Sequence, residues 1–172
     1  MSRTRILVAG IGNVFLGDDG FGVEVAAQLA GRPQPEGVEV ADYGIRGFDL
    51  ACAMTECDVA ILVDAIPRGK APGSLFVLEP DMTGDMGGGD VLNAHGLNPL
   101  EVFRLVRRFG RELPPTYLVG CEPSDAEDVE EVMALSAPVA ASVVGAVELV
   151  ESLLARLIEE PAAAEPAAPK ES

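Results

Sequence analysis

Residues 5–22 read Arg-Ile-Leu-Val-Ala-Gly-Ile-Gly-Asn-Val-Phe-Leu-Gly-Asp-Asp-Gly-Phe-Gly. The apolar beginning is typical of a buried strand, and the glycines that follow are typical of a tight turn into a helix. In a dinucleotide site such a turn brings a phosphate group to the helix N-terminus, where Asp18 and Asp19 would repel it. This turn therefore favours a cation over a phosphate.

The composition limits the class of protein. The chain has 172 residues, 48% of them hydrophobic, which is enough for one core of ordinary size. Its formal net charge of -16 disfavours nucleic acid and anionic membranes as partners. Three cysteines without a Cys-x-x-Cys pair indicate free thiols, as in the reducing cytoplasm. The apolar run after Arg5 is too short for an export signal, so we expect a cytoplasmic protein that is not inserted in a membrane.

Strand-like and helix-like patterns alternate along the chain, which predicts an α/β fold. Near-continuous apolar runs at 5–10 and 58–64 predict central strands that are covered on both faces. We expect weaker strands at 37–42, 74–79 and 115–120, and helices at 20–30, 98–109 and 138–159. The link between 58–64 and 74–79 is too short for a crossover helix, so these two strands should run antiparallel in a mixed sheet.

Other segments lack the pattern of regular structure. Residues 80–93 are rich in glycine and are expected to form a mobile loop that ends near His95. The acidic residues 127–131 are expected to be a solvated surface. The low-complexity tail, 160–172, is expected to be disordered, which leaves a single domain over residues 1–159.

Side chains from three parts of the chain can meet at one edge of the sheet. Asp18 and Asp19 follow the first strand and Asp64 ends another, and in α/β sheets ligands bind outside the carboxyl ends of the strands. His95 precedes a helix that Asn98 can cap, and a loop can bring its imidazole to the same edge. Carboxylates and an imidazole suit a divalent ion such as Ni²⁺, Zn²⁺ or Co²⁺, and the spacing does not choose among them.

Each of these residues also has a purely structural explanation. A tight glycine turn needs no ligand, and Asp18 and Asp19 can stabilise a helix N-terminus through its dipole. Asp64 can cap a turn, and a solitary His95 in a polar loop can be solvated. Taken one at a time, the residues do not decide between the two interpretations.

Several short motifs together resemble the maturation endopeptidases of nickel-iron hydrogenases, peptidase family M52. In the family's order and approximate spacing they are Gly10-Ile-Gly-Asn13, Gly17-Asp-Asp-Gly-Phe-Gly22, Gly44-Ile-Arg-Gly47, Val63-Asp-Ala65, His95-Gly96 and Gly120-Cys-Glu-Pro123. The resemblance covers residues 5 to about 158. It implies a three-layer α/β/α domain with a twisted, mostly parallel five-stranded sheet that carries one antiparallel strand. It also implies an endopeptidase that removes the C-terminal extension of the hydrogenase large-subunit precursor once nickel has been inserted.

The resemblance implies a metal site as well. Carried over by position, the family's metal-contacting residues fall on Asp19, Asp64 and His95, which are also the catalytic candidates. Asp19 stands where some relatives have glutamate. Asp42 matches a family aspartate near the site, although Tyr43 and Ile45 depart from the usual Asp-Gly-Gly-Thr sequence. The implied metal is nickel, which the precursor would present to a monomeric enzyme that does not hold it permanently.

Two other functions stay open at this point. A hydrolase could pair His95 with Cys57, Cys121 or a serine as the nucleophile, since a dyad needs only one histidine. A nickel-binding chaperone or inspection module could use the same ligands without cleaving anything.

Overall fold

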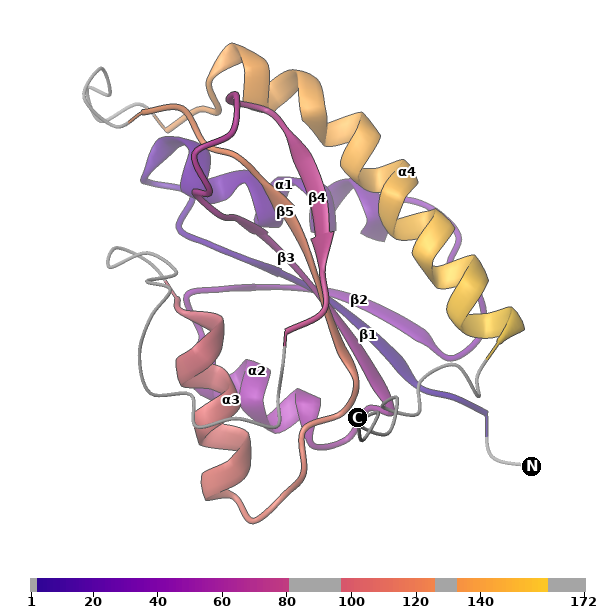
Figure 1. Ribbon diagram of the computed structural model, residues 1–172. Coiled ribbons are helices and arrows are strands. Elements are labelled where there is room, and N and C mark those ends of the chain that lie inside the picture. Colours follow the sequence, from indigo (N-terminus) through magenta and orange to yellow (C-terminus); the bar gives the residue numbers. More distant parts are fainter. Residues whose placement is uncertain (1–2, 81–96, 126–132, 161–172) are drawn as a thin grey trace, which may run out of the picture.

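The computed structural model describes residues 3–80, 97–125 and 133–160 (Figure 1). Its strands are β1 (Ile6–Ile11), β2 (Val38–Gly44), β3 (Val59–Ala65), β4 (Leu75–Leu78) and β5 (Thr116–Cys121). Its helices are the short 3-10 helix η1 (Gly17–Gly20) and the α-helices α1 (Phe21–Ala30), α2 (Gly47–Met54), α3 (Pro99–Arg108) and α4 (Ala137–Glu159). The predictions for His95, the acidic run and nearly all of the glycine-rich loop and of the tail lie outside the described residues.

The five strands form one sheet in the order β2-β1-β3-β5-β4. β1 pairs in parallel with β2 and β3, and β3 pairs in parallel with β5, whereas β4 is antiparallel to β5. The predicted central positions of β1 and β3 are confirmed. All six residues of β1 and all seven of β3 are buried, as expected for strands covered on both faces.

The predicted direction of β4 is correct, but its neighbour in the sheet is β5 and not β3. The link after β3 crosses the end of β5, where Ile66 donates its backbone N–H to the carbonyl of Cys121 (2.9 Å) and Gly73 donates to that of Glu122 (2.8 Å). The buried carboxylate of Glu122 fixes this link by accepting the N–H groups of Arg68 (2.7 Å) and Gly69 (3.2 Å). The chain therefore passes β5 before it reverses, and β4 pairs with the outer side of β5.

Helices cover both faces of the sheet, which confirms the three-layer α/β/α architecture. Figure 1 shows α1 and α4 on one face and α2 and α3 on the other. On the first face, Phe21 and Leu29 of α1 pack with Val143 and Leu154 of α4. The second face has its own apolar cluster, which includes Phe103 of α3.

Of the four α-helices in the described segments, the sequence patterns locate three and miss α2. This helix has eight residues and begins at a glycine, so it is too short to show a clear period. Tertiary packing stabilises it, since Leu50, Ala51 and Met54 are buried in the cluster that contains Val102 and Phe103 of α3. The predicted cap of α3 is confirmed, because the side chain of Asn98 accepts the N–H of Leu100 (3.0 Å).

α4 is long and apolar enough to cross a membrane, with 23 residues and a mean hydropathy of 1.6 over its most apolar window. Length and composition alone are weak evidence for a membrane span, because a core helix passes the same test. Here the stripe that includes Val139, Val143, Val147 and Leu154 is buried in the core of the domain. This packing indicates a core helix.

Candidate functional site

The loops that follow β1 and β2 lie side by side at the carboxyl edge of the sheet. The backbone N–H of Gly12 donates to the carbonyl of Gly44 (2.9 Å). Gly12 has a φ of 131°, and a Cβ there would lie 1.8 Å from the backbone oxygen of Asp19. Only glycine fits this conformation and this contact. The turn can therefore fold back over the end of β1 and carry Asp19 to the edge of the sheet.

A second glycine brings α1 against the ends of the central strands. A Cβ on Gly22 would lie 2.0 Å from the carbonyl oxygen of Val63 and 2.5 Å from that of Ile11. The first turn of α1 therefore packs directly on the backbone of β1 and β3. This close packing places the η1 turn beside the last residues of β3, where Asp64 lies.

Asp64 is the most unusual titratable side chain in the described part of the molecule. It is 7% exposed, and its Oδ1 has no hydrogen-bond partner among the described residues. Burial and then the negative charge of Asp19 raise its pKa well above the usual value, and a backbone hydrogen bond with Ala65 acts in the opposite direction. A buried carboxylate oxygen without a donor costs free energy, and a bound cation would offset that cost.

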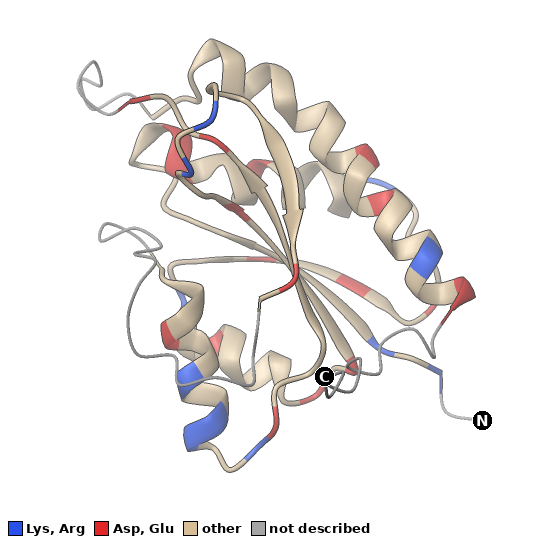
Figure 2. Ribbon diagram, viewed as in Figure 1, with Lys and Arg blue, Asp and Glu red and all other residues tan. Residues whose placement is uncertain are grey.

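Asp19 lies close enough to Asp64 for the two charges to interact. Its Oδ2 accepts the backbone N–H of Asn13 (2.7 Å), which orients the carboxylate within the turn. Figure 2 shows acidic residues on this segment of η1 and α1. The structure thus brings two of the three predicted ligands together, and His95 lies outside the described residues. Among the described residues no group of three or more His, Cys, Asp or Glu side chains is placed to hold a metal ion.

Asp18 faces different partners from those of Asp19. Its carboxylate accepts hydrogen bonds from the backbone N–H groups of Ser124 (2.9 Å) and Ser136 (2.7 Å) and from the hydroxyl of Ser136 (2.9 Å). The helix N-terminus that Asp18 meets is thus that of α4 and not that of α1. The sequence gives no signal for this contact, since the two partners are separated from Asp18 by 106 and 118 residues.

With this geometry in place, comparison with known proteins gives the family. A family model described as hydrogenase maturation protease matches residues 23–153. The chain belongs to the hydrogenase maturation protease family. Among solved structures, the hydrogenase maturating endopeptidase HybD from Escherichia coli is 31% identical, with a TM-score of 0.72 over 89% of this chain and 93% of that chain. The [NiFe] hydrogenase maturation protease HycI from Thermococcus kodakarensis is 28% identical, with a TM-score of 0.62 over 92% of this chain and 94% of that one.

Curated relatives agree with this family. The hydrogenase expression/formation protein HupD of Bradyrhizobium diazoefficiens is 35% identical over 125 residues, which is 72% of this chain and 65% of the relative. HupM of Azotobacter chroococcum is 34% identical over 128 residues, or 74% of this chain and 61% of the relative. The chain therefore spans somewhat less than two thirds of the length of these relatives.

In this member of the maturation protease family, Asp42 lies near the end of β2. It pairs in register with Gly10 of β1, and its Oδ1 lies 3.7 Å from where a Cβ on Gly44 would stand. Its carbonyl accepts a hydrogen bond from the guanidinium of Arg46. These contacts place Asp42 beside the Gly12–Gly44 junction but give its carboxylate no defined role.

The cysteines of this maturation protease do not have the environment of a nucleophile. The thiol of Cys121 is buried next to the carbonyl of Glu122 (3.7 Å), and burial raises its pKa. Burial also raises the pKa of Cys57 to about 11. A catalytic cysteine needs a lowered thiol pKa, so the cysteine–histidine hydrolase finds no support here.

Large apolar side chains are exposed on the two loops that flank the candidate site. Phe15 is 62% exposed in the loop after β1, where Val14 and Leu16 are exposed too. Ile45 is 61% exposed in the turn after β2, and Phe48 is equally exposed on α2. Exposed apolar groups gathered around a site are typical of a surface that binds another protein.

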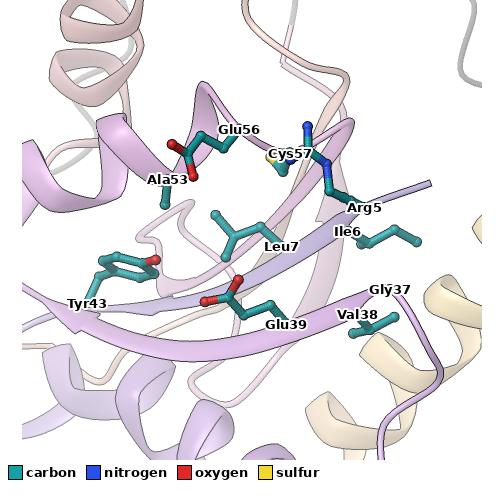
Figure 3. Close-up of a pocket in the computed structure, with 10 residues that line it drawn as sticks. All are labelled: Arg5, Ile6, Leu7, Gly37, Val38, Glu39, Tyr43, Ala53, Glu56 and Cys57. Atoms are coloured by element: carbon teal, nitrogen blue, oxygen red, sulfur yellow. The ribbon is translucent and has the colours of Figure 1, made fainter. Parts of the chain in front are cut away.

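A hollow of about 530 Å³ lies elsewhere, between the amino-terminal part of β1 and β2 and the end of α2 (Figure 3). Leu7, Ala53 and the ring of Tyr43 line it, and Glu39 and Glu56 lie at its sides. Because ligands of α/β sheets bind at the carboxyl ends of the strands, the hollow is not part of the candidate site.

Proposed function

We propose that this chain is an endopeptidase that removes the C-terminal extension of the nickel-iron hydrogenase large-subunit precursor after nickel has been inserted. Membership of the maturation protease family supports the protease activity. The nickel part of the proposal rests on the buried Oδ1 of Asp64, which lies beside Asp19 and has no hydrogen-bond partner in the described part of the chain. A protein that uses this pair only for structure gains nothing from burying such an oxygen.

In this proposal the precursor brings its own nickel to Asp19, Asp64 and His95. Carboxylate oxygens and an imidazole nitrogen are a suitable ligand set for such an ion. Cleavage then depends on metal loading, because an empty precursor offers nothing for these side chains to bind. A bound divalent ion can also polarise a carbonyl group or lower the pKa of a bound water to about 7, which supplies hydroxide at neutral pH.

The raised pKa of Asp64 makes binding of the cation depend on pH. In the free protein its environment favours the protonated form of the carboxyl group. An arriving cation must displace that proton, because metal ligands bind in their deprotonated form. Loss of this proton leaves two negative carboxylates side by side, and the positive charge of the bound ion offsets the repulsion between them.

The surface around the site supports a protein substrate over a small molecule. Phe15 and Ile45 present exposed apolar side chains on either side of the Gly12–Gly44 junction. Burying such side chains against the precursor would stabilise the complex. The proposal places this encounter in the cytoplasm and assigns the protein no membrane or nucleic-acid partner.

Substitution of the proposed ligands tests the site. Asp64→Asn and His95→Ala should remain folded and fail to shorten the nickel-loaded precursor in a gel-shift assay. Asp58→Asn is a matched control, because Asp58 precedes the same strand at its opposite end, where it accepts the N–H of Arg5 (2.7 Å). This control should process the precursor normally. Wild-type processing by both ligand variants would refute the site, and failure of the wild-type protein to process it would refute the function.

A further inference from the structure

Asp18 and Asp19 are neighbours in η1, yet they belong to different parts of the structure. The carboxylate of Asp19 accepts the backbone N–H of Asn13 in its own loop and lies beside Asp64. Asp18 reaches across the molecule to Ser124 and Ser136. Because one short turn carries both carboxylates, what holds Asp18 also fixes the orientation of Asp19.

The contacts of Asp18 form a small, ordered network. Ser136 donates both its N–H (2.7 Å) and its hydroxyl (2.9 Å) to the carboxylate, and Ser124 donates its N–H (2.9 Å). The two serine hydroxyls are also 2.9 Å apart. Since the one hydroxyl proton of Ser136 points at Asp18, the hydroxyl of Ser124 donates to that of Ser136. Hydrogen bonds to a carboxylate are stronger than those between neutral groups.

The partners of Asp18 belong to well-packed elements. Ser136 is the N-cap residue of α4, whose Val139 and Val143 are buried in the core three and seven positions later. The second turn of α4 has a further contact, because the hydroxyl of Ser142 lies within hydrogen-bond distance of the carbonyls of Gly73 (2.7 Å) and Pro138 (2.8 Å). Ser124 follows β5 closely. Asp18 is thus tied to elements whose buried side chains pack on the sheet.

From this arrangement we propose that Asp18 is a positioning residue, which locks η1 to the start of α4 and so holds the carboxylate of Asp19 at Asp64. The metal-related consequence rests on the proposed function, whereas the positioning itself does not. Asp18 touches neither the metal nor the substrate in this account. It acts through Asp19 alone.

Hydrogen exchange of backbone amides, measured in the full chain, tests whether Asp18 positions Asp19. The amide of Asn13 bonds to Asp19 and not to Asp18, so its protection reports on Asp19. In Asp18→Asn an amide NH2 group replaces one carboxylate oxygen, and this donor then faces the donor groups of the two serines. The exchange rate of the Asn13 amide should then rise about tenfold or more, the loss that a broken hydrogen bond of ordinary strength gives.

Substitutions of the two serines should change the exchange rate at Asn13 by different amounts. Ser136→Ala removes one donor and keeps the N–H bond, so the exchange rate at Asn13 should lie between those of wild type and Asp18→Asn. Ser136→Thr keeps a hydroxyl and should restore wild-type exchange. Ser124→Ala is the matched control, because its hydroxyl bonds to Ser136 and its N–H bond to Asp18 remains. Circular dichroism during thermal unfolding should show all four variants folded.

Exchange at Asn13 can also decide against the proposal. If Asp18→Asn speeds exchange at Ser124 and Ser136 but leaves Asn13 at the wild-type rate, the network stabilises only the start of α4. If Asn13 responds, kcat for processing the nickel-loaded precursor should fall in the same order as its protection. A response at Asn13 without any processing by the wild-type protein would retain the positioning role and refute the proposed function.

Discussion

Asp64, the last residue but one of β3, lies so near Asp19 that the negative charge of Asp19 adds to burial in raising the pKa of Asp64. The two residues reach this position from different strands, and tight glycine contacts bring them together. Burial intensifies the repulsion because little water screens the charges. The pair is unfavourable for an empty protein and favourable for one that receives a cation.

The first prediction concerns stability. Asp64 has a folded-state pKa above its unfolded value, so the unfolded chain loses this proton first as pH rises, and stability falls from about pH 4 upward until the folded-state pKa is passed. Asp64→Asn removes this effect and should be more stable than wild type by about 1–2 kcal/mol at neutral pH. Urea unfolding at several pH values measures the difference, which should vanish near pH 3, below both pKa values. A less stable variant at neutral pH would contradict the prediction.

The second prediction concerns metal binding. Because a cation must displace the proton of Asp64, affinity of the protein for Co²⁺ or Ni²⁺ should fall about tenfold per pH unit below the raised pKa of this residue. Calorimetric titrations in buffers of different ionisation enthalpy measure both the affinity and the proton released. Affinity that stays constant until the pH range of an ordinary aspartate would show that Asp64 is not a ligand.

The third prediction concerns the tight turn. Gly12→Ala should destabilise the protein by about 3 kcal/mol or more, because its Cβ would overlap the backbone oxygen of Asp19 in a conformation that already favours glycine. Gly69→Ala is the control, since Gly69 also has a positive φ (74°) but its Cβ would meet nothing within 4 Å. That control should lose only about 1 kcal/mol. Equal losses in urea unfolding would mean that close packing at Gly12 is unimportant.

The fourth prediction concerns docking of the precursor. Ile45→Ser should raise KM for the precursor about tenfold, the loss expected when one large apolar side chain no longer contributes to binding, with little change in kcat. Ile158→Ser serves as the matched control, because Ile158 is also exposed (43%) but lies near the end of α4. Steady-state processing rates distinguish the two variants. A KM that changes equally in both would place the docking surface elsewhere.

The fifth prediction concerns the thiols. Cys52 is exposed and should react first with iodoacetamide, whereas burial and a raised pKa protect Cys121 and, in part, Cys57. Processing should continue after alkylation of Cys52, as mass spectrometry of the labelled protein and a processing assay can show together. Loss of activity in step with labelling of one cysteine would revive the cysteine–histidine hydrolase.

Local sequence patterns predict most of this fold. Strands β1 and β3 are visible because both faces are buried, which leaves an uninterrupted apolar run. The α4 stripe is visible because its period continues over 23 residues. The neighbour of β4 is not visible, since a short link dictates strand direction but does not say which strand lies alongside. The helix α2 is also missed, because its stability comes from packing on α3.

The candidate site is predictable only in part, for the same reason. Strand ends are sequence features, so the approach of Asp19 to Asp64 follows from the topology of a parallel sheet. The different roles of Asp18 and Asp19 do not follow from it, because two adjacent carboxylates look alike in a sequence. What separates them is the contact of Asp18 with Ser136, and only the folded chain brings these residues together.

The central claim is that this protein cleaves the precursor only when the precursor contains nickel. Its most direct test is the mass of the large-subunit precursor after incubation with the purified protein, once with nickel-loaded and once with nickel-free precursor. We expect loss of a C-terminal peptide from the loaded precursor and an intact nickel-free one. An intact C-terminus in both samples would indicate a binding module that does not cleave, and equal cleavage of both would contradict the role of nickel as the signal.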